Sequence, residues 1–356
     1  MARALVRRGH KVTVACYAHG LGEPHPSLRV VRTPAVPGYD NLRAGPDLVK
    51  PLLDAALALR LCLEDADIVH AHNYEAPIAA YIARALRGTP VVYNNHNTMA
   101  EELHTYFEGE LSRRIARVVG RTLDRTVPRL ADACVAISED AVGILEALGC
   151  QRVTHVPPGV DPEDLVTGDA ALVRERYGLG DRVWVVYAGN PDAYQDLGDL
   201  VDAVLQLDDV GLLMVSASGL ERWEERARAL PEARKRFVVT PHWPEVRELV
   251  AASDIAALPR RVCSGYPIKL LNSLGLGIPT VCARGSSRPI QGIVTVPNGD
   301  PAAIAEALHA LSQDPHRRLE LGRAAALDIR THHTWDARAA ELETVYAQVL
   351  GYGPAL

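Results

Sequence analysis

A short turn of small residues precedes a helical pattern within 264–283, and its residue types suit an anion. Ser264, Gly265 and Tyr266 form the turn, and Lys269 follows early in the helix. The start of a helix presents unpaired N–H groups and the positive end of the helix dipole, so an anion can bind there. The pattern therefore predicts either a diphosphate site, to which Lys269 adds a positive charge, or an ordinary strand–helix unit of a parallel sheet.

Two histidines stand at the ends of neighbouring predicted strands. His72 follows the strand expected at 67–71, and His96 follows the one at 90–94. Open α/β folds bind ligands at the carboxyl ends of their strands, so both are candidates to contact a substrate or to serve a structural role. His70 is expected to be packed inside its strand. No third ligand has suitable spacing, so no metal site is predicted.

Arginines recur at every fourth position of the helix expected at 109–131, namely Arg113, Arg117, Arg121, Arg125 and Arg129, with Arg114 beside them. The apolar residues Leu111, Ile115, Val118, Val119 and Leu123 are expected to form the opposite face, packed on the core. The arginine face is then either simply solvated or docks on anionic lipid. Near such a surface each arginine contributes about 1 kcal/mol.

The elements that must position these residues alternate between short β-branched runs and helical patterns. Alternation of this kind predicts parallel sheets. Strands are expected at 11–16, 29–33, 67–71, 90–94, 133–137 and 152–156, and then at 183–188, 211–216, 236–240, 254–258, 279–283 and 292–296. Two such series, separated by the Pro- and Gly-containing stretch 156–161, predict two doubly wound domains. The tail 301–350 is expected to be helical.

Composition excludes several classes of protein. The 356 residues carry a net charge of −6, which argues against nucleic acid as a partner. The six cysteines are scattered without a CxxC pair, as expected for reduced thiols in a cytoplasmic protein. The sequence contains no stretch of 18 apolar residues, so no membrane span is predicted.

The first residues are unusual for a doubly wound domain, which should open with a strand, a glycine turn and a helix. Residues 2–9 instead have the pattern of a last helical turn followed by a glycine cap. We therefore expect the first domain to lack its central strand, with a gap beside strands 11–16 and 67–71. We further expect the natural protein to begin upstream.

The order of these motifs resembles the GT-B glycosyltransferases of the retaining family 4, also called glycosyltransferases group 1. The matching segments are Arg3–Val14, Asp67–His72, Pro90–His96, Ala131–Ser138, Val156–Asp161, Tyr187–Asn190, Ser264–Ala283 and Thr334–Trp335. The resemblance covers the whole chain apart from the missing first strand. It implies two Rossmann-like domains with a deep cleft between them. The acceptor-binding domain would span 1–158 and the nucleotide-sugar-binding domain 159–333, and a helix over 334–356 would cross back to the first.

The resemblance also implies a reaction and a set of site residues. The reaction is retaining transfer of a sugar from a nucleotide-sugar to an unidentified acceptor, with lipid-linked and polysaccharide acceptors among the options, and without a metal ion or other cofactor. His96 would be catalytic, and His72 and Asn97 would bind the acceptor. The donor would be bound by Gly189, Asn190, His242, Arg260, Ser264, Gly265, Tyr266, Lys269 and Asn272.

The chain departs from the family pattern at the donor site. The two glutamates of the family's Glu-x7-Glu frame fall on Ser264 and Asn272, and its basic pair falls on Asn190 and Gln195. Weaker or altered donor binding is expected, with Lys269, Arg260 and Arg261 as the remaining cations. These losses keep open a non-catalytic GT-B homologue that acts as a binding or partner subunit. A nucleotide-sugar 2-epimerase is a further, less favoured option. Both the missing carboxylate frame and the crossing tail weigh against it. The expected location is cytoplasmic, with peripheral membrane contact through 109–131 as an option.

Overall fold

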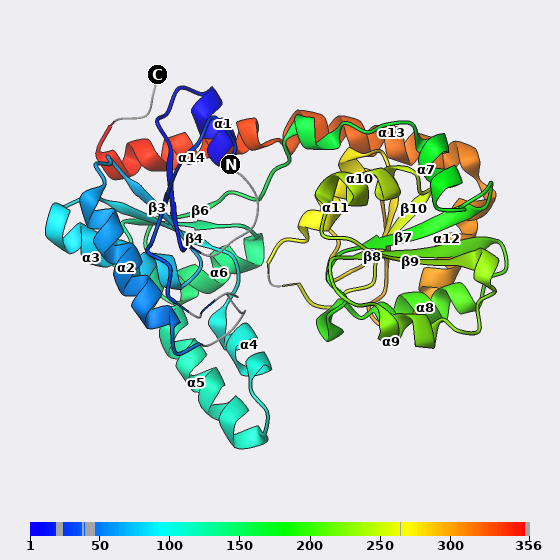
Figure 1. Cartoon of the computed structure of the whole chain (residues 1–356), viewed down its shortest axis with the longest axis horizontal. Helices are drawn as coiled ribbons and strands as arrows, with labels where there is room; N and C mark the ends of the chain where they lie inside the picture. Colours follow the sequence, from blue (N-terminus) through cyan, green and yellow to red (C-terminus); the bar gives the residue numbers. More distant parts are fainter. Residues whose placement is uncertain (19–23, 38, 40–46, 264, 353–356) are drawn as a thin grey trace. The chain divides into compact units, whose positions relative to one another are not determined.

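The computed structural model describes residues 1–18, 24–37, 39, 47–263 and 265–352. The chain divides into two compact units, each of which can be followed in Figure 1. Unit 1 consists of Met1–Pro158, Ser264–Tyr266 and Trp335–Leu356, and unit 2 of Gly159–Cys263 and Pro267–Thr334. Every strand pairing in the described residues is parallel, which confirms the predicted α/β class. The acceptor and donor roles expected for the two halves stay predictions.

Unit 2 is a six-stranded sheet in the order β12-β11-β10-β7-β8-β9. Its strands are β7 (Val183–Ala188), β8 (Val210–Ser216), β9 (Lys235–Val239), β10 (Ile255–Leu258), β11 (Thr280–Ala283) and β12 (Ile293–Val296). Helices α8 (Leu197–Leu205), α9 (Glu221–Arg226) and α12 (Pro301–Gln313) pack on one face of the sheet. Helices α7 (Ala170–Arg176) and α10 (Trp243–Ala251) pack on the other. Both faces are therefore buried, so the strands are nearly continuous apolar runs.

The strand order of unit 2 reverses beside β7. The chain runs from β7 outward through β8 to β9, and then returns to place β10 on the opposite side of β7. Helix α11 (Ile268–Gly275) follows β10, and α13 (Pro315–His332) packs against α11. In open parallel sheets such a reversal leaves a crevice at the carboxyl ends of the two central strands, where ligands bind. The residues that follow β7 and β10 are therefore the candidates for ligand binding in unit 2.

Unit 1 contains two sheets in its described residues. The first pairs β1 (Thr13–Cys16) with β2 (Arg29–Arg32), and the second has the order β3-β4-β5-β6. The latter strands are β3 (Val69–His72), β4 (Val91–Asn95), β5 (Ala133–Ala136) and β6 (Val153–His155). Strands β1 and β3 thus belong to different sheets. That a missing central strand would fill the place between β1 and β3 stays a prediction.

Helices surround the strands of unit 1. They are α1 (Ala2–Arg7), α2 (Lys50–Leu63), α3 (Glu75–Arg87), α4 (Met99–Glu102), α5 (Glu110–Thr126), α6 (Glu139–Ala147) and α14 (Trp335–Leu350), with a 3₁₀ turn η1 at Leu103–Tyr106. Helix α14 packs against α1 through a small core that contains Leu5 and Ala339. Arg8 and Glu343 add a two-pronged ion pair, with N···O distances of 2.6 and 2.7 Å. These contacts tie the two helices together.

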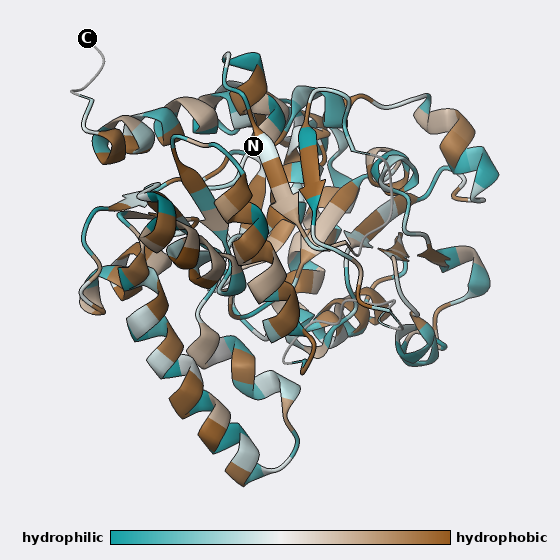
Figure 2. Ribbon diagram, turned by 60° about the vertical axis from the view of Figure 1, so that its left-hand side comes forward, coloured by the Kyte–Doolittle hydropathy of each residue, from teal (hydrophilic) through white to brown (hydrophobic). Residues whose placement is uncertain are grey.

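Helix α5 corrects an expectation about which of its faces is buried. The apolar residues expected in the core are largely exposed, since Leu111, Ile115, Val118 and Val119 have exposed fractions between 44% and 73%. The buried positions instead recur at Ala116, Gly120 and Asp124. Gly120 permits close packing, because a Cβ there would lie 2.4 Å from the Met99 carbonyl oxygen. Figures 1 and 2 show α4 and α5 projecting beyond the sheets of unit 1, and Figure 2 shows brown and teal residues mixed along α5.

Candidate functional site

Three histidines gather at the carboxyl ends of β3 and β4. The Nδ1 atom of His72 lies 3.0 Å from Nε2 of His96, and Asn94 Nδ2 donates to the same His72 atom at 3.3 Å. His70 stacks on His72 with ring centroids 4.8 Å apart, and its Nδ1 atom lies 2.6 Å from the Tyr346 hydroxyl of α14. The strand register brings His72 opposite Asn94, which explains this meeting of side chains.

The cluster is held in the neutral form. Burial lowers the pKa of His96, and burial together with the neighbouring His96 lowers the pKa of His72 to about 4. His70 is buried more deeply, and its pKa falls well below the ordinary value. Since the His72–His96 contact occupies one nitrogen of each ring, His96 is left with Nδ1 for a substrate hydroxyl. His72 contacts His96, and its expected role in binding the acceptor stays a prediction.

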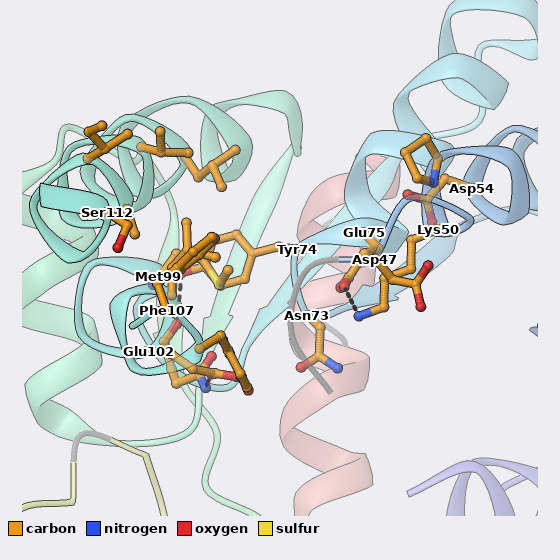
Figure 3. Close-up of a pocket in the computed structure, with 18 residues that line it drawn as sticks. Asp47, Lys50, Asp54, Asn73, Tyr74, Glu75, Met99, Glu102, Phe107 and Ser112 are labelled. Carbon is orange, nitrogen blue, oxygen red and sulfur yellow. Dashed lines mark hydrogen bonds and ion pairs between the residues drawn. The ribbon is translucent and has the colours of Figure 1, made fainter. Parts of the chain in front are cut away.

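A cavity of about 690 Å³ opens beside these strand ends within unit 1 (Figure 3). Asn97, the other residue expected to bind the acceptor, lines it, whereas His72 does not. Figure 3 shows Asp47, Lys50, Asp54, Asn73 and Glu75 on one side, and Tyr74, Met99, Glu102, Phe107 and Ser112 on the other. The lining also includes the apolar side chains of Leu103, Tyr106, Ile115, Ala116, Val119 and Leu123. Most of these residues were not predicted from the sequence, because they come from separate helices and no local motif marks them.

Asp124 fixes the wall of this cavity. It is buried on α5, where its carboxylate accepts hydrogen bonds from the Met99 and Ala100 N–H groups at 2.8 and 2.9 Å and from the Tyr74 hydroxyl at 2.5 Å. The first two bonds satisfy N–H groups at the start of α4, as a helix cap does. The third joins α4 and α5 to the turn that follows β3. Asp124 therefore serves the packing of this wall.

In unit 2, Lys269 lies at the reversal of strand order. Its ammonium donates to the Tyr187 hydroxyl at 2.8 Å and to Gln195 Oε1 at 3.0 Å, and it lies 4.7 Å from the centre of the Tyr187 ring. Burial, with a smaller contribution from the positive charge of Arg260, lowers the pKa of Lys269 to about 8. The group is therefore mostly charged at neutral pH. Two of its three protons are used by these partners, so it can also donate to a ligand.

The neutral residues Gln195 and Asn190 form a chain with Lys269. Gln195 Nε2 donates to Asn190 Oδ1 at 2.9 Å, and the Tyr187 hydroxyl donates to the Asn190 carbonyl oxygen at 2.6 Å. Gly189 makes room for the lysine, because a Cβ at this position would lie 2.6 Å from Nζ. The structure thus brings together three residues predicted at the donor site, namely Gly189, Asn190 and Lys269. The sequence did not indicate that Tyr187 would be a hydrogen-bond partner of Lys269.

The other expected donor residues differ in their surroundings. Arg260 follows β10 and lies with its guanidinium 4.8 Å from the Tyr194 ring centre, while Arg261 is paired with Asp199 at 2.8 Å, which compensates its charge. His242 is exposed at the start of α10, after β9. Asn272 follows Lys269 by three residues on α11, which places both on neighbouring turns of one side.

The turn before α11 stays a prediction. Helix α11 begins at Ile268, within the segment 264–283 where a helix was expected. Gly265 and Tyr266 are grouped with unit 1, and Ser264 lies outside the described residues. Lys269 itself belongs to unit 2. No three His, Cys, Asp or Glu side chains gather into a group that could hold a metal ion within the described part of the chain.

Comparisons with known proteins agree on the family. Residues 1–164 match the family model "Glycosyltransferase Family 4", and residues 182–314 match "Glycosyl transferases group 1". The D-inositol 3-phosphate glycosyltransferase of Xylanimonas cellulosilytica is 29% identical over 392 aligned residues, covering 100% of this chain and 91% of that protein. The corresponding protein of Pseudarthrobacter chlorophenolicus is 26% identical, covering 98% of this chain and 89% of its own.

Solved structures share the fold. Sucrose-phosphate synthase from Thermosynechococcus elongatus superposes with a TM-score of 0.82 at 17% identity, covering 99% of this chain and 92% of that one. Anabaena HepE in complex with UDP-glucose gives a TM-score of 0.71 at 15% identity, covering 95% and 99%. The two family models together span most of the chain, and with these relatives and folds they establish that it belongs to the GT-B glycosyltransferases of family 4.

Proposed function

We propose that this glycosyltransferase moves a sugar from a nucleotide-sugar to an acceptor hydroxyl with retention of the anomeric configuration. The observation that carries the proposal is the half-buried ammonium of Lys269, beside Gly189 at the reversal of strand order in unit 2. The HepE structures contain UDP, UDP with glucose, or UDP-glucose, so a protein of this fold binds such a donor. A diphosphate needs cations or N–H groups as partners, and Lys269 and Arg260 are the cations that follow β10 without a carboxylate partner among the described contacts.

The proposed chemistry follows from charge. The bond between the anomeric carbon and the diphosphate oxygen breaks, and the electron pair leaves with the diphosphate. Lys269 and Arg260 stabilise that leaving group, which supplies the largest expected contribution to catalysis. The acceptor oxygen attacks the same face of the sugar, and its proton passes to the departing phosphate oxygen. His96 hydrogen-bonds the transferred sugar through Nδ1. We propose that no metal ion takes part, because these cations provide the compensating charge.

The identity of the acceptor and contact of the protein with a membrane are further parts of the proposal. The relatives' name makes D-inositol 3-phosphate the first acceptor to test. The exposed arginines and apolar residues of α5 also support peripheral contact with an anionic membrane, which would suit a lipid-linked acceptor. None of the helices in the described ranges is both long and apolar enough to cross a membrane.

Two variants test the reaction. Lys269→Met keeps the apolar stem but removes the charge, so affinity for a nucleoside diphosphate measured by calorimetry should fall by about 1.5–3 kcal/mol. Lys235→Met is the matched control, because Lys235 pairs with Glu232 in the same unit at 2.7 Å. His96→Ala should lower turnover at least about tenfold and leave nucleotide affinity unchanged.

Several results would contradict the proposal. Unchanged nucleotide affinity in a folded Lys269→Met protein would remove Lys269 from the donor site. A large fall in thermal stability for His96→Ala, with turnover per folded molecule unchanged, would leave His96 a structural residue. A panel of nucleotide-sugars with donor-hydrolysis controls would also reveal a partner subunit, which turns over nothing, or an epimerase, which converts the donor alone.

A further inference from the structure

The cavity of unit 1 has an acidic end. Three carboxylates lie together on one side of it, namely Asp47, Asp54 and Glu75, and Lys50 is the single cation among the described lining residues, with its Nζ atom 3.5 Å from Glu75 (Figure 3). Carboxylates accept hydrogen bonds from hydroxyl groups, and an excess of them repels phosphate. This end of the cavity therefore suits an uncharged group that carries several hydroxyls.

The opposite wall of the cavity is apolar and continues onto the surface. Met99, Phe107, Ile115 and Val119 line it. Ile115 and Val119 are 56% and 44% exposed, and their neighbour Leu111 on the same helix is 73% exposed. The lining therefore passes without interruption from a closed apolar surface to an exposed one along α5. An apolar chain that leaves the cavity along this path would cover side chains that otherwise face water.

We infer that this cavity binds an amphiphilic acceptor, with an uncharged polyhydroxyl head at the acidic end and an apolar chain against α5. The term acceptor rests on the proposed function, but the binding itself does not. The cavity lies where β3 and β4 end, and Asn97 and Asn73 at its lining directly follow His96 and His72 in the chain. A head group held there lies next to the histidine proposed to contact the transferred sugar.

Binding of two matched ligands to the full chain tests the inference without any donor. Octyl β-glucoside, kept monomeric, should bind at least about tenfold more tightly than methyl β-glucoside, because part of its chain is buried. Val119→Asn should weaken octyl glucoside at least about fivefold and leave methyl glucoside unchanged. Val118→Asn is the matched control, because Val118 is a neighbouring exposed valine that does not line the cavity. Glu75→Gln should weaken both glucosides equally.

A charged ligand and the nucleotide complete the test. D-inositol 3-phosphate should compete at least about tenfold less well than octyl glucoside, because the carboxylates of the cavity repel its phosphate. Equal binding of octyl and methyl glucoside, equal loss in the Val119 and Val118 variants, or tighter binding of D-inositol 3-phosphate than of octyl glucoside would overturn the inference. A parallel UDP titration keeps the two proposals apart. UDP binding without octyl glucoside binding refutes the cavity ligand alone, and the reverse result refutes the donor site alone.

Discussion

At the scale of residues, the histidine cluster couples the site of unit 1 to pH. His70, His72 and His96 are all held neutral by burial, whereas an unfolded chain protonates its histidines near pH 6.5. The unfolded state therefore binds more protons than the folded state between the two pKa values. Stability that these groups contribute is present above about pH 6.5 and is lost as the pH falls through their folded-state pKa values, which for His72 is about 4.

Acidification below about pH 6.5 should accordingly destabilise the protein. Between pH 6.5 and pH 4 the free energy of unfolding should fall by up to about 1.4 kcal/mol per pH unit for His72, and the lowered pKa values of His70 and His96 act in the same direction. Urea unfolding at pH 7.5 and pH 5 measures this loss. Glu343 does not contribute to this loss between pH 7.5 and pH 5, because its ion pair with Arg8 lowers its pKa to about 2. His72→Gln should flatten the pH dependence, and equal stability of the parent protein at both pH values would refute the assignment.

Residue types alone revealed which cations to examine but could not reveal their partners. Lys269 was predicted at the donor site because a helix follows a strand there. Its hydrogen-bond partners Tyr187 and Gln195 lie 82 and 74 residues earlier in the chain. Only the fold brings such distant positions together. The same reason hid the pairing of Arg261 with Asp199, which cancels a charge that the sequence counted as available.

At the scale of elements, the strands were easy to predict and the faces of α5 were not. Buried parallel strands are compact apolar runs, so all twelve expected strands lie within about two residues of the observed bounds. Helix α5 has Arg and apolar residues interleaved, and its buried face consists of Ala116, Gly120 and Asp124. Small residues and a carboxylate do not produce a periodic pattern of large apolar residues, so the buried face of α5 could not be recognised from the sequence. The short helices α4 and α7 were not expected for a similar reason, since each is too short for a periodic pattern.

A pair of glycine substitutions tests the packing of α4 on α5. Gly120→Ala should destabilise the protein by about 1–3 kcal/mol, because the added methyl group would overlap the Met99 backbone. Gly143→Ala in α6 is the control. A Cβ at Gly143 meets no atom within 4 Å, so the better helix propensity of alanine should stabilise by about 0.5–1 kcal/mol. Chemical denaturation of both variants measures the difference, and stabilisation by Gly120→Ala would show that the helices do not pack as described.

The arginines of α5 should bind anionic vesicles through charge. Replacing Arg114, Arg121 and Arg125 by glutamine should lower the free energy of vesicle binding by about 3 kcal/mol at low salt, at about 1 kcal/mol for each charge. The effect should shrink as salt screens the charges. Replacing Arg317, Arg323 and Arg330 of α13 removes the same charge elsewhere and is the control. Equal losses in co-sedimentation for the two triple variants would attribute binding to net charge instead of α5.

At the scale of the whole molecule, alternation of strands and helices predicted two parallel α/β series from local pattern alone. The placement of the final helix depended on resemblance, because nothing within 335–350 specifies which sheet it covers. In the structure α14 packs on α1, and Tyr346 contacts His70. Such long-range contacts are set by matching surfaces, which a single sequence does not reveal.

The packing of α14 on α1 has a consequence for synthesis. Arg8 and Glu343 are 335 residues apart, so at about 5–20 residues per second the first helix waits roughly 17–67 s for its partner to be translated. Unit 2 is nearly contiguous in sequence and can fold during that wait. The half of the protein that is made second should therefore mature first, with Leu5 and its neighbours exposed to chaperones in the meantime. Ribosome-stalled chains in which residue 334 is followed by an unrelated linker long enough to clear the exit tunnel should show protease resistance in unit 2 and sensitivity in unit 1. The reverse order of resistance would mean that unit 1 reaches its final packing without α14.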